Sequence, residues 1–425
     1  MLDSGFRRND SKRRPMIFYE FINIKKEGLL ATTEEKIGLM EPMLPPEGER
    51  NIEDLAIDLA TKASGLASQL PQAVRRGMGD LVRSMNCYYS NLIEGHDTHP
   101  RDIERALTHS DYSADPEKRV LQLEAVAHIE VQRLIDHCED LQAEPTSTEY
   151  IRWLHREFCR RLPDELLWVK NPDSGERLSV VAGELRKGWV QVGGHIPPKA
   201  AALPRFLKRF AEAYEMQKLS RLRQIIALGA AHHRLLWIHP FYDGNGRVAR
   251  LMSHASLLRC GVGSSLWSVA RGLARNVQDY KALLMAADTP RHGDLDGRGT
   301  LSTQTLTAFC EFFLTVCIDQ VKFMAALLEP NELLRRMRLH VEEEVQAGNL
   351  PKGSFLMLRE GLLAGEVPRG RAGEITGYGE RMARNVVSDL LKKGYLKSAG
   401  PRAPLVLAFP MDAVERWFPR LYPAG

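Results

Sequence analysis

Residues 239–250 of this 425-residue chain, HPFYDGNGRVAR, place a base, an acid, two glycines and two arginines within twelve consecutive positions. Gly244 and Gly246 carry no side chain that would cover the neighbouring backbone N–H groups. If a helix begins near Asn245, those N–H groups and the positive end of the helix dipole point at one spot. The segment therefore predicts a site for an anion such as a phosphate.

The charged residues of this segment suit the same chemistry. Asp243 could hold a magnesium ion, because Mg2+ prefers one or two carboxylate oxygens together with oxygens of the substrate. Arg247 and Arg250 are three positions apart, so a helix would place both on one face, where they can bind phosphate oxygens. His239 is the group able to accept a proton near neutral pH.

Taken one residue at a time, a Gly-Asn-Gly turn followed by a basic helix would also explain the segment. The whole string, however, matches at every defining position the signature of the Fic (Fic/DOC) family, HPFx(D/E)GNGRxxR. Most members of that family transfer AMP from ATP to a hydroxyl group of a target protein. The resemblance implies a protein adenylyltransferase, an AMPylating nucleotidyltransferase, that uses ATP as substrate and Mg2+ as cofactor.

The resemblance also implies roles for individual residues. His239 would deprotonate the attacking Ser, Thr or Tyr, and Asp243 would bind the magnesium ion that bridges the α and β phosphates. Gly244–Gly246 would form the anion hole, while Arg247 and Arg250 would hold the β and γ phosphates. The residues that would bind ATP are Phe241, Gly244, Asn245, Gly246, Arg247 and Arg250.

Other functions remain open beside AMP transfer. A Fic enzyme can use another nucleotide or a phosphocholine donor, or remove AMP again from its target. The intact Gly-Asn-Gly sequence favours ATP in the AMP-donating orientation. A rival from another class is a DNA-binding transcriptional regulator whose Fic core serves only as a sensor or a self-modifying switch.

Residues 90–95, SNLIEG, resemble the inhibitory motif of the same family, (S/T)xxxE(G/N). They lie upstream of the catalytic string, as in the class whose inhibitory helix belongs to the same chain. Ser90 and Glu94 are four positions apart, so a helix would put both on one face, and Gly95 is suited to end that helix. The resemblance implies autoinhibition by Glu94 through Arg250, and the alternative is a solvated helix end.

Composition agrees with a cytoplasmic enzyme. The chain is 44% hydrophobic and 26% charged, and 58 basic against 54 acidic residues leave a net charge of only +4. This balance provides no global attraction to nucleic acid or membrane. No apolar stretch approaches the ~20 residues needed to cross a bilayer. Six cysteines without CxxC pairs predict reduced thiols in the core, at Cys87, Cys138, Cys159, Cys260, Cys310 and Cys317.

The chain divides into four regions. Residues 1–15 are polar and basic, and are expected to be a disordered tail or to precede the true start at Met16, with a nucleic-acid-binding arm as the alternative. Residues 16–115 are expected to form a helical region that contains the inhibitory helix. Residues 116–330 would form the Fic catalytic core, and residues 331–425 a separate module.

The first three regions are predicted to be mainly α-helical. Helical patterning begins near Ile52, continues in amphipathic segments such as 118–137 and 204–219, and includes a helix that ends at His239.

A β-hairpin is expected to interrupt these helices. Residues 177–181 and 188–192 are β-prone, and the sequence GGHIPP at 193–198 ends the pair. In Fic proteins the corresponding hairpin is a flap beside the active site, whose edge can pair with an extended segment of the target. The resemblance therefore implies that the target protein docks at residues 176–198. Trp189 is as well suited to the core as to a target-facing position.

The module after residue 330 resembles a winged helix-turn-helix domain. Helices are predicted at 354–363, 371–375 and 380–393, with strands at Leu396 and 405–407. The third helix is expected to turn a set of apolar residues inward, namely Met382, Ala383, Val386, Val387, Leu390 and Leu391.

The polar face of that third helix, together with the wing, could enter DNA. The candidate DNA-binding residues are Arg381, Arg384, Asn385, Ser388 and Lys392, with Arg402 on the wing. Winged helices also dock proteins or form dimers, so a protein partner and a homodimer stay open.

Two metal sites can be imagined and are not favoured. His232 and His239 are seven positions apart with His233 beside them, yet no HExxH motif or cysteine partner supports zinc. Packed or solvated histidines are preferred. The segment Gly293–Gly299 superficially suggests calcium, but it lacks the twelve-residue ligand pattern and is expected to be a surface loop.

Overall fold

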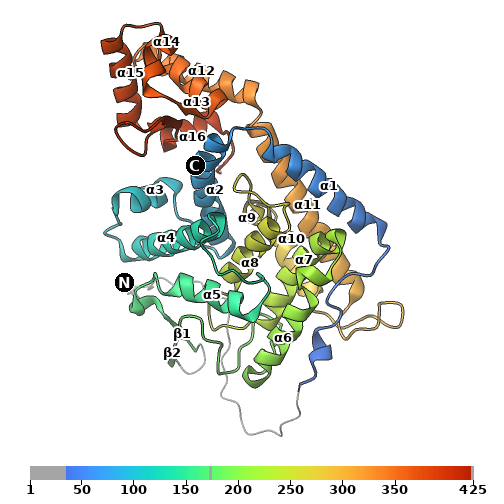
Figure 1. Ribbon diagram of the computed structural model, residues 1–425. Helices are drawn as coiled ribbons and strands as arrows, with labels where there is room; N and C mark the ends of the chain where they lie inside the picture. The colour runs from blue at the N-terminus through green and yellow to red at the C-terminus, as the bar shows by residue number, and fades with distance from the viewer. Residues whose placement is uncertain (1–34, 172–174, 423–425) are drawn as a thin grey trace, which may run out of the picture.

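The computed structural model describes residues 35–171 and 175–422 (Figure 1). Helices make up 62% of the fold, so the predicted mainly α class is confirmed. No helix of the described residues is long and apolar enough to cross a membrane. The basic segment 1–15 lies outside the described residues.

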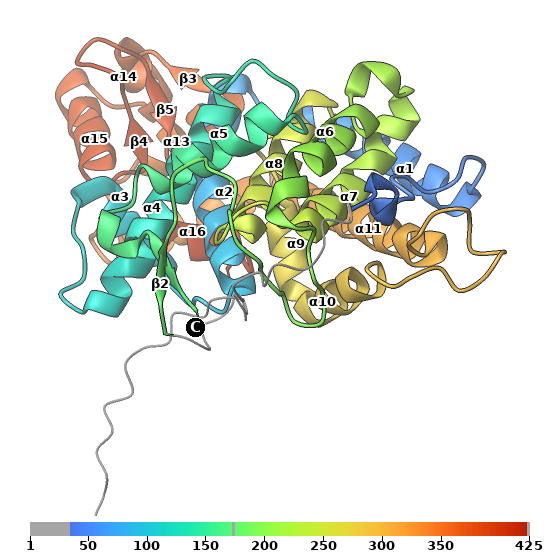
Figure 2. The same ribbon diagram turned by 90° about the horizontal axis from the view of Figure 1, so that it is seen from below.

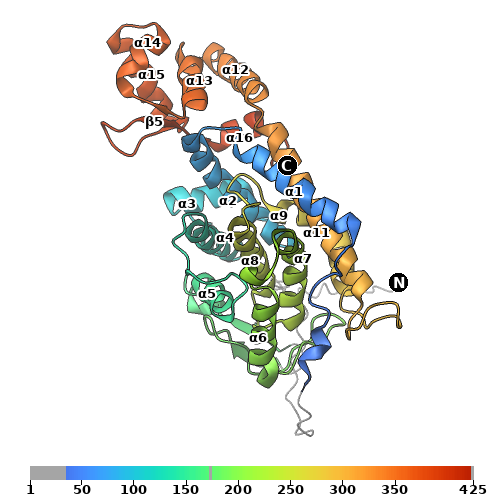
Figure 3. The ribbon, with the colours of Figure 1, turned by 45° about the vertical axis from the view of Figure 1, so that its right-hand side comes forward.

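Long helices form the part of the protein that precedes the C-terminal region. They are α1 (Arg50–Ala67), α2 (Gln72–Ile93), α3 (Pro100–His109), α4 (Pro116–Asp136), α5 (Thr148–Cys159), α6 (Leu203–Ala213), α7 (Arg221–Ile238), α8 (Asn245–Arg259), α9 (Val269–Arg275), α10 (Val277–Ala286) and α11 (Thr303–Leu327). α1 packs along α11, α11 packs on α7, and α7 packs on α8 (Figures 1 and 3). This stack buries α8 in the middle of the fold.

Local sequence signals explain where several helices begin. The side chains of Asp115 and Ser220 each accept a backbone N–H in the first turn of α4 and α7, as helix-capping residues do. The helices predicted from Ile52, over 118–137, and up to His239 are present as α1, α4 and α7.

The helix predicted over 204–219 is broken into two pieces. α6 ends at Ala213, and a separate 3-10 turn covers Met216–Lys218. The side-chain amide of Gln224 donates to the carbonyl oxygens of Met216 and Leu219, at 2.8 and 3.1 Å. This side chain satisfies backbone groups that a continuous helix would have paired internally.

The predicted flap strands do not pair with each other. Residues 177–179 form β2 (Arg177–Ser179), but its antiparallel partner is β1 (Trp168–Lys170), which the sequence prediction had missed. Residues 188–192 are not a strand, and only an isolated bridge joins Val192 to His195. The prediction of a hairpin between 177–181 and 188–192 was therefore wrong.

A single buried arginine explains this difference. Arg186 donates to the carbonyl oxygens of Gly188 and Pro198, and also to that of His239 at 2.8 Å. Its side chain thus occupies one backbone acceptor of the expected second strand, the carbonyl oxygen of Gly188. The segment is held against the loop at His239 as irregular backbone.

The C-terminal region has its own small sheet. Its elements are α12 (Pro330–Gln346), α13 (Ser354–Ala364), β3 (Glu366–Val367), α14 (Ala372–Thr376), α15 (Glu380–Lys392), β4 (Leu396–Lys397), β5 (Leu405–Leu407) and α16 (Met411–Trp417). The three strands are antiparallel in the order β3-β5-β4. The three predicted helices and the predicted pair of late strands are present, and β3 adds a third strand.

One predicted core residue of α15 is exposed. Met382 has 58% of its surface accessible, whereas Ala383, Val386, Val387 and Leu390 are buried. These four occupy positions i, i+3, i+4 and i+7, which share one helical face, and Met382 lies one residue off that face. The inward assignment of Met382 was wrong.

Helix α2 connects the C-terminal region to the middle of the protein. A side chain at Gly77 would meet the Leu407 carbonyl oxygen of β5 at 3.1 Å, so helix and strand lie in close contact there. Further along α2, the hydroxyl of Tyr89 donates to the carbonyl oxygen of Leu421 at 3.1 Å. Figure 2 shows α2 and α3 beside the red C-terminal elements, with α6 and α7 on the far side.

Candidate active site

The loop between α7 and α8 carries the chemistry-bearing string. α7 ends at Ile238, and His239 takes a left-handed conformation with φ 49° and ψ 63°. The loop closes at Gly244, whose φ of 79° favours glycine, and α8 begins at Asn245 as predicted. The N-terminus of this buried helix therefore faces the loop, and its backbone N–H groups and dipole favour an anion there.

Two residues predicted to bind ATP hold the loop in place. The Asn245 side chain accepts the Phe241 N–H and donates to the Phe241 carbonyl oxygen, each at 3.0 Å. The Phe241 ring is fully buried and stacks on His155, with ring centroids 3.9 Å apart. His155 in turn accepts the N–H of Gly183 at 2.9 Å, which ties the loop to the segment after β2. No sequence signal pointed to His155.

His239, the predicted base, is buried, with 2% of its surface exposed. Burial lowers its pKa to about 3, because the charged imidazolium is desolvated, and the nearby Arg186 and His195 act in the same direction. Its imidazole is therefore neutral at physiological pH. That is the form able to accept a proton.

Asp243, the predicted magnesium ligand, lies beside the first turn of α8. Its Oδ1 accepts the N–H of Gly244 at 2.7 Å. Burial raises the pKa of this carboxyl group, and the nearby Arg247 opposes that rise. Among the described residues, no group of three or more His, Cys, Asp or Glu could hold a metal ion. A single carboxylate beside a phosphate cradle fits Mg2+, which takes most of its ligands from substrate and water.

The residues predicted to be inhibitory meet the second arginine of the string. Arg250 donates from Nε to Ser90 Oγ at 2.8 Å and from Nη2 to the Ser90 carbonyl oxygen at 3.3 Å. Nη2 also binds Glu94 Oε1. Glu94 caps the end of α2, and Gly95 follows with a φ of 85°. The spacing of Ser90 and Glu94 on one helical face thus brings both onto Arg250.

The Glu94 carboxylate lies against the start of α8. A methyl group at Gly246 would come within 2.5 Å of Glu94 Oε1, so glycine is needed for this contact. Burial raises the pKa of Glu94, but Arg250 and Arg247 outweigh burial and lower the pKa overall. An ionised carboxylate therefore lies where the sequence predicted an anion.

The first arginine of the string has a different partner. Arg247 donates from Nη2 to Glu124 Oε2 at 2.6 Å, and both side chains are buried. Glu124 comes from the middle of α4, and nothing in the sequence indicated it. The two predicted phosphate-binding arginines are thus both in contact with carboxylates.

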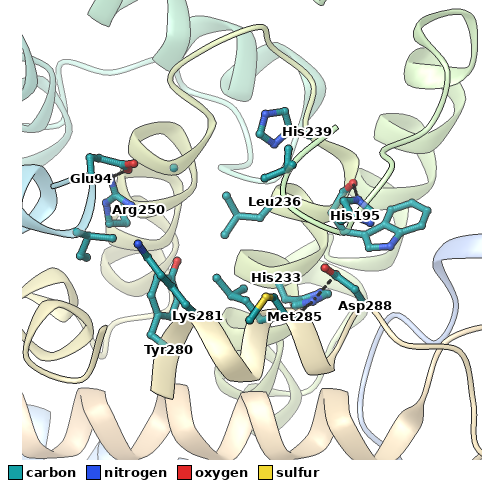
Figure 4. Close-up of a pocket in the computed structure, with 16 residues that line it drawn as sticks. Glu94, His195, His233, Leu236, His239, Arg250, Tyr280, Lys281, Met285 and Asp288 are labelled. Atoms are coloured by element: carbon teal, nitrogen blue, oxygen red, sulfur yellow. Dashed lines mark hydrogen bonds and ion pairs between the residues drawn. The ribbon is translucent and has the colours of Figure 1, made fainter. Parts of the chain in front are cut away.

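A cavity of about 500 Å³ opens beside these groups. Figure 4 shows the Glu94–Arg250 pair at one side of it and Asp288 at the other, with His239 and Leu236 between them. Its apolar lining includes Leu236, Tyr280, Leu284 and Met285. Such a cavity, with flat apolar walls and an anion site at one end, can take a nucleotide.

The residues of the two unfavoured metal sites bond to other protein groups. His232 contacts Ser253 and Tyr280, each at 2.8 Å, and His233 lies 3.1 Å from Asp288. These two histidines are packed in the core, as the sequence analysis favoured over a zinc site. In the 293–299 loop, Asp296 accepts two backbone N–H groups, which makes it a structural turn. Of the six unpaired cysteines five are buried as predicted, whereas Cys138 is exposed.

Residues 145–257, from just before α5 to the last turn of α8, match the model of the Fic/DOC family. The chain carries a Fic domain. α2 with Ser90 and Glu94, and the region after residue 330, lie outside the matched segment.

Relatives of the Fic domain are enzymes by name. "Protein adenylyltransferase Fic" from Drosophila erecta and from Drosophila melanogaster are each 40% identical to this chain over 82 residues. The match spans 19% of this chain and 17% of each relative. A Fic family protein of known structure from Desulfovibrio desulfuricans G20 has a TM-score of 0.50 and 17% identity, covering 86% of this chain and 98% of that one. That likeness concerns the fold.

The buried histidines around the Fic domain make its stability depend on pH. Burial lowers the pKa of His155 to about 4, and of His128, His232 and His239 to about 3. Between about pH 6.5 and 4 the unfolded chain binds protons at these positions and the folded chain does not. The free energy of unfolding should therefore decrease as the pH is lowered through this range, by up to about 1.4 kcal/mol per pH unit for each histidine.

Urea unfolding followed by circular dichroism at pH 7.5, 6.0 and 5.0 measures this slope. His128→Asn should reduce the slope, and replacement of the exposed His109 by Asn should leave it unchanged. Equal stability at pH 6.0 and 5.0 would contradict the neutral, buried state of these imidazoles.

Proposed function

We propose that the protein transfers AMP from ATP to a Ser, Thr or Tyr hydroxyl of a target protein. One observation carries the proposal: the cavity joins a neutral buried histidine to the N-terminus of a helix that bears two arginines. His239 supplies a base, and Gly244–Gly246 with the arginines supply an anion cradle. The relatives named protein adenylyltransferases support this activity.

The proposed step is an in-line displacement at the α-phosphorus. The target hydroxyl oxygen attacks, its proton goes to His239, the bond to the β-phosphate breaks, and pyrophosphate leaves. A magnesium ion at Asp243 would neutralise charge on the phosphates. Catalysis then consists mainly of positioning and of stabilising charge, because backbone N–H groups and Arg247 hold the triphosphate.

The target would dock at residues 176–198. β2 pairs with β1 on one edge, and among the described residues no strand pairs with its other edge. The nearby Val181 and Ile196 are exposed, and Trp189 is half-buried. An extended target segment can add to such an edge through backbone hydrogen bonds without demanding a particular sequence.

Transfer of AMP distinguishes this protein from a kinase. After incubation with a cell lysate, label from α-phosphate should appear on protein, and label from γ-phosphate should not. His239→Ala should abolish transfer but leave ATP affinity within about threefold, because the base acts mainly in the transition state. His137→Ala, on the surface, is the matched control. Efficient incorporation of γ-label would overturn the assignment.

We further propose that Glu94 holds the enzyme nearly inactive. By resemblance Arg250 should grip the γ-phosphate, and in the structure its guanidinium is bound by Glu94 and Ser90. ATP could then enter the cavity only with its phosphates displaced. A displacement of about 1 Å can cost on the order of 100-fold in rate.

Removal of the carboxylate should therefore activate the protein. Glu94→Gly should raise AMP transfer, including self-modification, by about 100-fold while changing ATP affinity much less. Arg250→Ala breaks the same pair but should not activate, because the phosphate contact is lost too. The measured quantity is the initial rate of AMP incorporation with Mg2+ and ATP. An unchanged rate in Glu94→Gly would show that this segment is an ordinary helix end.

The rival function is transcriptional regulation through DNA binding, and the exposed basic residues of the C-terminal region support it. We propose that residues 331–425 form a winged-helix module, beside a catalytic core over 116–330 and a region over 16–115, of which residues 16–34 lie outside the described part of the chain and the remainder is helical. α15 exposes Arg381, Arg384, Asn385 and Lys392, and the β4–β5 turn exposes Arg402. Among the described residues, Arg384 pairs with the exposed Glu380 of its own helix, and such an exposed i,i+4 pair contributes little to stability.

This face should bind duplex DNA with an affinity that falls as salt rises. In the full-length protein, Arg384→Glu should weaken binding roughly tenfold or more at low salt. Arg335→Glu, at an exposed position of α12, is the control and should change it little. Fluorescence anisotropy against salt concentration measures both. Self-association without any DNA binding at low salt would instead identify a protein-docking module and a homodimer.

A further inference from the structure

Glu124 binds the first arginine of the phosphate cradle and has no assigned role. Its side chain projects from the middle of α4 and is 11% exposed. One of its oxygens, Oε2, accepts from Arg247 at 2.6 Å and lies 3.3 Å from Nδ1 of His96. Burial raises the pKa of Glu124, but Arg247 and His96 outweigh burial and lower it, so the carboxylate is ionised.

The guanidinium of Arg247 is fixed from two directions. Glu124 holds Nη2, and the guanidinium carbon lies 5.1 Å from the ring centroid of Phe158. A guanidinium is planar and carries five N–H donors, so fixing one edge sets the direction of the others. In the described part of the chain, Nε of Arg247 has no hydrogen-bond partner although it is buried. A donor therefore remains for a ligand.

The two carboxylates that contact the arginines lie at different places in their helices. Glu94 lies at the end of α2 and is followed by Gly95, so a change in the last helical turn could release it. Glu124 lies well inside α4, and α4 packs against α2, α5 and α8. The backbone at Glu124 is thus held on several sides, and a buried Arg247 that lost its partner would be an uncompensated charge.

We propose that Glu124 is a positioning residue for ATP, which holds Arg247 in one orientation while the remaining N–H groups contact phosphate. The proposal rests on the proposed function, because it places the triphosphate at Arg247. It assigns opposite roles to the two carboxylates: Glu94 blocks the cradle, and Glu124 maintains it.

The test uses the Glu94→Gly protein, in which activity can be measured. Adding Glu124→Gln keeps the size of the side chain and removes its charge. The KM for ATP should rise roughly tenfold, and kcat should fall by less than about threefold, since ground-state phosphate contacts are weakened. Glu130→Gln is the matched control, because Glu130 is on the same helix and, among the described residues, forms its ion pair with the half-exposed Arg133, away from Arg247. It should leave KM unchanged.

A second comparison separates positioning from a general structural effect. In an Arg247→Lys background, Glu124→Gln should raise KM by less than about twofold, because a residue that acts through Arg247 has nothing left to orient. Equal effects in both backgrounds would overturn the proposal. So would activation by Glu124→Gln in the otherwise unchanged protein, which would make Glu124 a second inhibitory carboxylate.

Calorimetric titration with Mg2+ and ATP measures the affinity for ATP directly, without any need for AMP transfer. Weaker ATP binding by the Glu124→Gln protein supports the positioning role even if no AMP transfer is found, and in that case only the proposed reaction fails. Unchanged ATP affinity together with an unchanged KM overturns the role of Glu124.

Discussion

The ion pair between the buried Arg250 and the half-buried Glu94 is the interaction on which the site depends. It joins the end of α2 to the second turn of α8, and it puts a negative charge beside the N-terminus of that helix. Two opposite unit charges about 4 Å apart attract by about 4 kcal/mol at an effective dielectric constant of 20. Under the proposed autoinhibition a phosphate would have to compete with this contact for Arg250. The contact requires glycine at Gly246, where a methyl group would collide with the carboxylate.

Helix α2, which ends at Glu94, also contacts the C-terminal region. Its first half packs on β5 of the C-terminal region, at Gly77, and its second half passes Tyr89, which is bonded to Leu421, before it ends at Glu94. The Fic domain and the C-terminal region are therefore joined by one continuous helix. The two carboxylates at the arginines come from helices that pack on each other, α2 and α4.

Part of the site could be predicted from local signals and part from the family motifs. The helix start at Asn245 follows from the glycines beside it, and the meeting of Glu94 with Arg250 followed from family resemblance and helical spacing. The partners Glu124 and Arg186 could not be predicted, because they belong to no family motif and their contacts with Arg247 and His239, across 123 and 53 positions, leave no local signal. The flap prediction was wrong because β propensity does not show where the backbone groups of a segment bond: Arg186, between the two expected strands, takes the carbonyl oxygen of Gly188 and is held against the loop at His239. Domain boundaries and the roles of individual residues stay predictions.

The most direct test of the account is a crystal structure of the protein with bound ATP and Mg2+, with Glu94 intact and with Glu94→Gly. The measured quantity is the distance from the Arg250 guanidinium to the γ-phosphate. The account predicts that Arg250 contacts the γ-phosphate only in the Glu94→Gly protein, and that Glu94 keeps Arg250 in the intact one. A γ-phosphate bound to Arg250 with Glu94 displaced in the intact protein would contradict it.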